Sequence, residues 1–343
     1  MIEVAELSGL ALLEGEPVFS SGECRVWRVN LGVPFETFIA DSKWGRDLAA
    51  KPEIVGEDFV SYNLRAAKGV AAFLGEILEK ELPLVFLHVL RASKGYMLHE
   101  ALRASGFKLA EAWIRPRYVA RGYGDHTVGD VEVVAKGFGA LEALRDYGEV
   151  ALIVADTVAT GNTLAKCLDE AYHELRARGL RVAQLVVYGF VSLEGLARVP
   201  HVAKRTCVVA LEDYAALASN RYDMPLYGVD RAFYELRGEV RSVGGATLLE
   251  IFEKLACEYA PGMDQPGDWS ERQPLLESES GLEAGNMKLH LERSLEALRS
   301  LKVITRKAPW FKQWMEEIFA EREASLLARA SRAGTRARPR ENL

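Results

Sequence analysis

Residues 153–164, IVADTVATGNTL, combine an acid and several small polar residues at a point where an apolar stretch gives way to a helical one. The run VALIVA over 150–155 predicts a buried strand, and residues 162–179 have the pattern of a helix. In open α/β sheets, ligands bind beyond the carboxyl ends of strands, and the first turn of a helix offers free backbone N–H groups and a positive dipole end. We therefore expect a phosphate group to be held by Ala159, Thr160, Gly161, Asn162 and Thr163.

The acid at the start of this turn needs a different ligand. Asp156 would repel a phosphate, so its carboxylate is better suited to sugar hydroxyls or to a magnesium ion. Ala155 stands directly before it and supplies no second carboxylate. The alternative interpretation is an ordinary strand-to-helix turn with a Thr or Asn cap.

Strands and helices alternate around this turn, which predicts an α/β fold with a parallel sheet flanked by helices. The expected strands are apolar without alternation, as in sheets that are covered on both faces. They are residues 84–90, 110–119, 131–137, 150–155, 182–191 and 206–212, with helices at 96–106 and 162–179. Before them, residues 17–40 predict two or three antiparallel strands, and residues 57–80 predict a helix.

The stretch 153–164 resembles the phosphoribosyl pyrophosphate (PRPP) loop of type I phosphoribosyltransferases. That loop has apolar residues, usually two acids, two variable residues and then a small-Thr-Gly-x-Thr/Ser run. ATGNT (159–163) matches this run, and Asp156 stands at the second acid. Ala155 stands at the first acid, whereas uracil-type members keep one acid at the first position. The chain therefore departs from both patterns.

Further segments resemble the same family. LRASKG (90–95) is similar to the LRAG-x-G loop of uracil phosphoribosyltransferases, and its Lys-Gly pair is similar to the orotate enzymes. MPLYGVDRAFYE (224–235) resembles the base-binding PGLGDxGDR segment of the uracil type, and residues 18–29 resemble an N-terminal stretch of the orotate type. The resemblance extends over roughly residues 17–240.

The resemblance implies transfer of a 5-phosphoribosyl group from PRPP to a nucleobase, with a pyrimidine favoured over a purine and Mg²⁺ as the cofactor. Asp156 would be the catalytic residue, orienting the ribose and holding magnesium indirectly. Asp230 and Arg231 would read the base, although an ordinary surface ion pair is the alternative. The pyrophosphate would contact Arg91, Ala92, Ser93, Lys94 and Gly95, for which a solvated loop is the alternative.

The basic, glycine-containing stretch 115–126, RPRYVARGYGDH, suits a lid that closes on pyrophosphate through Arg115, Arg117 and Arg121. A solvated basic face is the alternative. By position, the resemblance also implies an N-terminal β hood at about residues 15–45.

Composition limits the class of protein. The chain has 343 residues, is 49% hydrophobic and has a formal net charge of −6. This suits a globular protein with a sizeable core and argues against a nucleic-acid binder, which is usually basic. The four cysteines are far apart in sequence and predict reduced, buried thiols. No apolar run is long enough to cross a bilayer and no basic leader is present, so we expect a cytoplasmic protein without membrane contact.

We expect a phosphoribosyltransferase-like domain at 1–260, a linker or long loop at 261–284 rich in Pro, Gly, Ser and acids, and a C-terminal helical extension with a basic tail at 285–343. A homodimer is expected. Two functions stay open: an active phosphoribosyltransferase, or a non-catalytic PRPP- or nucleotide-binding regulator that kept the fold, for which Ala155 is the main evidence. A kinase is disfavoured because the sequence has no GxxxxGK[ST] motif.

Overall fold

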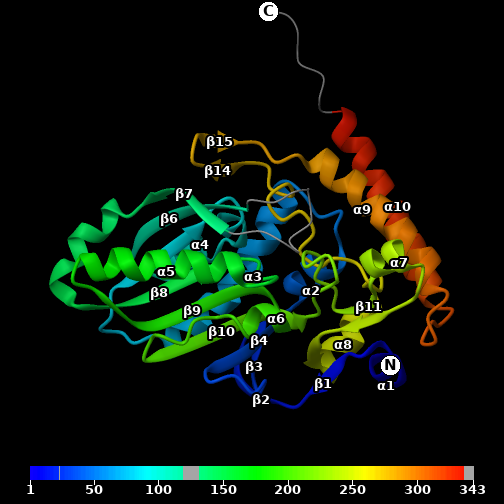
Figure 1. The fold of residues 1–343 in the computed structure, drawn as a ribbon, viewed down its shortest axis with the longest axis horizontal. Helices are drawn as coiled ribbons and strands as arrows, with labels where there is room; N and C mark the ends of the chain where they lie inside the picture. The colour runs from blue at the N-terminus through cyan, green and yellow to red at the C-terminus, as the bar shows by residue number, and fades with distance from the viewer. Residues whose placement is uncertain (23, 119–130, 336–343) are drawn as a thin grey trace, which may run out of the picture.

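A large, mostly parallel sheet organises the computed structural model, which describes residues 1–22, 24–118 and 131–335 (Figure 1). The strand order is β2-β3-β4-β10-β9-β8-β5-β6-β7, and the strands from β4 to β6 in this order are parallel. The strands are β2 (Gly15–Ser21), β3 (Cys24–Val29), β4 (Glu36–Ser42), β5 (Leu84–Val89), β6 (Leu109–Tyr118), β7 (Val131–Gly137), β8 (Glu149–Ala155), β9 (Arg181–Ser192) and β10 (Arg205–Ala215).

Helices cover both faces of this sheet, which confirms the expected α/β class. In Figure 1, α5 lies in front of the sheet, and α3 and α4 lie behind it. Every residue of β5 is buried, as its apolar sequence predicts for a strand packed on both sides. The helices are α1 (Ile2–Ser8), α2 (Lys43–Ala50), α3 (Glu57–Ile77), α4 (Leu98–Ala104), α5 (Asn162–Ala177), α6 (Leu193–Leu196), α7 (Arg231–Arg237) and α8 (Leu249–Ala256), with 3-10 helices η1 (Ser93–Tyr96) and η2 (Gly139–Tyr147).

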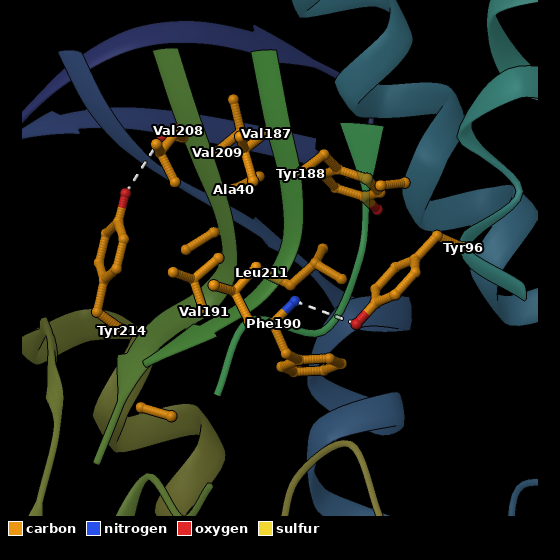
Figure 2. Packing of buried hydrophobic residues seen from close by; sticks show 14 of the residues in the cluster. Ala40, Tyr96, Val187, Tyr188, Phe190, Val191, Val208, Val209, Leu211 and Tyr214 are labelled. Carbon is orange, nitrogen blue, oxygen red and sulfur yellow. Dashed lines mark hydrogen bonds between the residues drawn. The ribbon is translucent and has the colours of Figure 1, made fainter. Parts of the chain in front are cut away.

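The core of the sheet is dense in aromatic and β-branched side chains. Figure 2 shows Tyr96 from η1 pointing at Phe190 of β9, whose backbone N–H donates to the Tyr96 hydroxyl at 3.3 Å. The Tyr214 hydroxyl donates to the carbonyl oxygen of Val208 at 3.1 Å. Buried hydroxyls with such partners add specificity to the packing without leaving an unpaired polar group. Cys24, Cys167 and Cys207 are buried free thiols as expected, whereas Cys257 is exposed.

The N-terminal strands differ from the expected hood at residues 15–45. β4 pairs in parallel with β10, from Glu36 opposite Cys207 to Ala40 opposite Leu211. β3 pairs antiparallel with β4, and β2 pairs antiparallel with β3. These strands therefore widen the main sheet, because β10 offers them an open edge.

Of the two expected forms, a linker or a long loop, residues 261–284 take the second, and this loop is packed into the protein. The Arg272 side chain is fully buried. It donates hydrogen bonds to the carbonyl oxygens of Ile54 and Lys51, both at 3.1 Å. The loop ends in a small hairpin of β14 (Leu276–Ser278) and β15 (Gly281–Glu283). The other short strands are β1 (Ala11–Leu13), β11 (Tyr227–Val229), β12 (Ser242–Gly244) and β13 (Ala246–Leu248).

The helical extension consists of α9 (Met287–Thr305) and α10 (Met315–Thr335), which pack against each other at one side of the fold (Figure 1). Trp310 lies between them in sequence, is fully buried and donates its indole N–H to the Ser242 hydroxyl at 2.8 Å. The extension is thus tied to β12. Among the described residues, no helix has the length and apolarity to cross a membrane.

Candidate functional site

A cavity of about 340 Å³ opens at the carboxyl edge of the parallel strands. Residues from β5, from β6 and from the turn after β8 line one side of it, and residues from the long loop line the other. The lining residues are 89–92, Arg115, Pro116, Tyr118, 156–161, Thr163, Leu164, Tyr222, Asp264 and 266–271. The position agrees with the rule that ligands bind at this edge of an open α/β sheet.

The turn between β8 and α5 forms the floor of the cavity. Its backbone is tied to β9, since the Val158 N–H donates to the Phe190 carbonyl oxygen at 2.8 Å and the Ser192 hydroxyl donates to the Ala159 carbonyl oxygen at 2.5 Å. Gly161 ends the turn with φ +76°, a left-handed conformation that glycine adopts without strain. The first amides of α5 have no carbonyl partner within the helix, so they can bind an anion.

The tight space around Gly161 is a second reason for a glycine at this position. A Cβ atom at this position would lie 2.8 Å from Cβ of Arg198 and 2.9 Å from the carbonyl oxygen of Gly195. The structure therefore brings four of the five expected phosphate-binding residues to the cavity: Ala159, Thr160, Gly161 and Thr163. The fifth, Asn162, is not among the described lining residues, and its side-chain oxygen accepts a hydrogen bond from Arg198 at 2.5 Å.

Asp156 lies at the mouth of β8 and lines the same cavity, with 4% of its surface exposed. Burial raises the pKa of its carboxyl to about 7, although a hydrogen bond with the Thr157 backbone favours the ionised form. A buried carboxylate facing a cavity can accept hydrogen bonds from ligand hydroxyls. Ala155 is fully buried and lies outside the lining that the described residues form.

The described side chains do not form a metal site by themselves. Within residues 1–22, 24–118 and 131–335, no group of three His, Cys, Asp or Glu side chains is arranged to hold a metal ion. A magnesium ion near the single carboxylate of Asp156 would need most of its ligands from a bound phosphate ester and water.

The loop after β5 is less open than the resemblance implies. Arg91 and Ala92 line the cavity, and the Leu90–Arg91 peptide bond is cis. Ser93, Lys94 and Gly95 form the start of η1 and are not part of the described lining. Gly95 packs closely on Gln273, since a Cβ atom there would lie 2.7 Å from the Gln273 side-chain carbon. The loop therefore touches both the cavity and the long loop.

Two of the three expected lid residues lie in a strand of the sheet. Arg115 and Arg117 belong to β6, and Arg115 lines the cavity and donates to the Leu90 carbonyl oxygen at 3.2 Å. They are strand residues, so they do not move as part of a loop. Arg121 lies outside the described residues.

Asp230 and Arg231 do not join this cavity within the described structure. Asp230 caps α7, accepting from the Phe233 N–H at 3.0 Å and from the Ser219 hydroxyl at 3.0 Å. It also forms an ion pair with Arg241. Because its oxygens are already used by the fold, the geometry does not favour the expected role in base recognition. Arg231 lies 3.9 Å from Asp223, in a neighbouring cavity of about 290 Å³.

Sequence reasoning missed the wall of the cavity that the long loop supplies. Trp269 stacks on Tyr96 with ring centroids 4.3 Å apart, and the Tyr96 hydroxyl lies 2.5 Å from the Thr157 hydroxyl. Asp268 accepts a hydrogen bond from the Tyr222 hydroxyl at 3.1 Å. The available signal for this wall was an aromatic residue between acids in 264–271, but the turn-like composition of that stretch concealed it.

Comparison with known proteins shows similarity to solved structures alone. No family model and no curated protein matches the sequence. The structure of the AQ2163 protein from Aquifex aeolicus is 16% identical, with a TM-score of 0.37 over 52% of this chain and 84% of that chain. A hypoxanthine phosphoribosyltransferase from Staphylococcus aureus is 17% identical, with a TM-score of 0.29 over 47% and 78% of the two chains. The Trypanosoma cruzi hypoxanthine phosphoribosyltransferase in complex with IMP is 25% identical, with a TM-score of 0.27 over 45% and 75%.

Proposed function

We propose that the cavity binds the 5-phosphoribosyl part of PRPP and that the protein transfers this group to a nucleobase. The observation that carries the proposal is that Asp156 and the amino end of α5 face one cavity, in the order and spacing of a PRPP loop. An anion at the helix end and hydroxyls at the carboxylate describe a sugar phosphate.

Each part of the turn has a task in this reaction. The amides and hydroxyls of residues 159–163 hold the 5-phosphate, and Asp156 accepts hydrogen bonds from the ribose hydroxyls. The bond between the ribose carbon and pyrophosphate breaks while a bond to a base nitrogen forms, and positive charge develops on the sugar ring. A fixed carboxylate close to that charge stabilises the transition state more than water does. Magnesium carried by PRPP would neutralise the departing pyrophosphate.

The nucleobase that receives the phosphoribosyl group would lie on the long-loop side of the cavity. Asp264, Asp268 and Tyr222 line this side and offer hydrogen-bond acceptors to the N–H groups of a heterocycle. A pyrimidine is our first choice of acceptor because of the uracil-type resemblance of LRASKG. The assay therefore also includes purines as alternative acceptor bases.

The test is pyrophosphate release from PRPP and magnesium with uracil, orotate, adenine, guanine, hypoxanthine or no base. Base-dependent release is expected, together with its loss in Asp156→Asn. The control is Asp169→Asn on the exposed side of α5, which should keep full activity. Normal turnover in Asp156→Asn would contradict the proposal.

A second candidate function is a regulator that binds PRPP or a nucleotide without turnover. It is favoured by Ala155, which leaves one carboxylate, and by the ion pairs that already engage Arg91. Calorimetry separates the two functions, since tight binding of PRPP without release for any base would assign the regulator. Thr160→Val should weaken binding of ribose 5-phosphate in either case, because it removes a hydroxyl from the cavity floor.

A further inference from the structure

The basic side chains of the loop after β5, of which Arg91 lines the cavity, are paired with carboxylates from residues 271–283 of the same chain. Arg91 contacts Glu271 at 3.0 Å and Glu283 at 2.9 Å. Lys94 contacts Glu277 at 2.5 Å. The cations that the resemblance assigns to pyrophosphate therefore already have anionic partners.

The strand residues beside this loop show the same pairing. Arg115 contacts Glu279 at 2.8 Å, and Arg117 contacts the same carboxylate at 3.8 Å. Four cationic side chains thus face four carboxylates, all of which come from one short segment. With the charges balanced, a pyrophosphate would gain little attraction unless it displaced the carboxylates.

The base of this segment is held firmly and independently of these ion pairs. Arg272 is fully buried, and Leu276 is 2% exposed. Gln273 donates to the Arg91 carbonyl oxygen at 3.4 Å. These contacts fix where the β14–β15 hairpin leaves the protein.

The outward side chains of the two hairpin strands are held in a different way. Leu282 is 68% exposed, so it contributes little apolar burial. Glu277 and Glu283 keep about two fifths of their side-chain surface in solvent, at 42% and 39%. Ion pairs that are partly exposed are weak and exchange readily with other anions. A hairpin that is anchored through Arg272, Gln273 and Leu276, but whose glutamates are held by partly exposed ion pairs, suits a segment that yields to a competing anion.

We infer that the β14–β15 hairpin determines which phosphorylated ligand the cavity accepts. With its carboxylates in place, the cavity takes a sugar or nucleoside 5-monophosphate, whose single phosphate binds at α5. A ligand that also has a diphosphate, such as PRPP, binds only by replacing Glu277, Glu279 and Glu283 at the cations. This inference rests on the proposed function, since it uses the phosphate site at residues 159–163.

The test compares the full-length protein with the triple variant Glu277→Gln, Glu279→Gln, Glu283→Gln by calorimetry. The probes are ribose 5-phosphate, inorganic pyrophosphate and PRPP. We expect at least tenfold tighter binding of pyrophosphate and PRPP in the variant, with no change for ribose 5-phosphate. The charge-matched control is Glu250→Gln, Glu253→Gln, Glu292→Gln, three exposed residues on α8 and α9.

The outcomes separate this inference from the proposed function. Unchanged binding of pyrophosphate in the hairpin variant, or an equal gain in the control, would overturn the inference. Failure of the unmodified protein to bind ribose 5-phosphate would instead overturn the phosphate site. The single variant Glu277→Gln, which changes one partly exposed side chain, repeats the comparison with minimal risk to folding and should bind pyrophosphate more tightly than the unmodified protein.

Discussion

Replacing Asp156 with asparagine should make the protein more stable and at the same time inactive. The carboxyl is buried, and its pKa is raised by that burial to about 7. A raised pKa means that the folded state keeps the proton over a pH range in which the unfolded chain has lost it. The free energy of unfolding therefore falls as pH increases from about 4 to about 7 and is then level. Asparagine has nearly the same shape, does not ionise and removes this fall.

The size of the effect follows from the shift. Each pKa unit corresponds to about 1.4 kcal/mol, so raising the pKa from 3.8 to about 7 costs the folded state about 4 kcal/mol at pH 9. At pH 5 the folded carboxyl is largely protonated, and the cost is about 1.5 kcal/mol. The stabilisation by Asp156→Asn should accordingly be more than twice as large at pH 9 as at pH 5. The hydrogen bond with the Thr157 backbone can be kept by the asparagine oxygen.

Urea unfolding at pH 5 and pH 9 measures this difference directly. Other buried acids with raised pKa values, such as Asp213, are present in both proteins and cancel in the comparison. Asp169→Asn, an exposed position on α5, should change stability little at either pH. Under the proposed function, kcat/KM of the unmodified protein should increase with pH until about 7, as Asp156 becomes a better acceptor for ribose hydroxyls. Equal stability of Asp156→Asn and the unmodified protein at pH 9 would refute the burial argument.

Three further substitutions test the surroundings of the site. Ala155→Asp should lower the free energy of unfolding by about 3 kcal/mol or more, because it buries a second carboxylate; urea unfolding checks this, and no loss would contradict it. Gly161→Ala should lower the free energy of unfolding by about 1–2 kcal/mol, because φ is positive there, and calorimetry should show weaker binding of ribose 5-phosphate. Gly179→Ala, at a similar φ but in open space, should keep that binding. Arg272→Lys should lower stability by about 3 kcal/mol in thermal unfolding, because lysine cannot replace the guanidinium donors to buried carbonyls; a small effect would show that the loop is not fixed there.

The parallel sheet was predictable because the signal for it is local. A strand covered on both faces is a short apolar run in the sequence. Such runs predict strands at 84–90 and 182–191, and the structure has β5 at Leu84–Val89 and β9 at Arg181–Ser192. The turn at 156–163 was equally local, since a strand end, small residues and a helix start are contiguous in sequence. Both predictions needed no knowledge of distant contacts.

The cavity's second wall could not be predicted in this way. Residues 261–284 have the composition of a linker, yet Arg272 bonds to carbonyl oxygens of Lys51 and Ile54, more than 200 positions earlier. Burial of a charged side chain depends on such distant partners and leaves no periodic pattern in the segment itself. The glutamates of the hairpin are a second example. Their sequence predicts solvated charges, whereas in the structure they lie beside Arg91 and Lys94.

The alanine before Asp156 acquires a physical meaning from these observations. Two adjacent carboxylates in a buried turn would raise each other's pKa, and they would need a cation to ionise together. With Ala155, the turn has one carboxylate, and burial raises its pKa to about 7 against the opposing effect of the hydrogen bond with the Thr157 backbone. The described lining already contains Asp264, Asp268 and Glu271 on the opposite wall, so the cavity does not lack acidic side chains when Ala155 supplies none. Under the proposed function, Ala155 leaves Asp156 as the one acid of this turn that is available to the sugar hydroxyls.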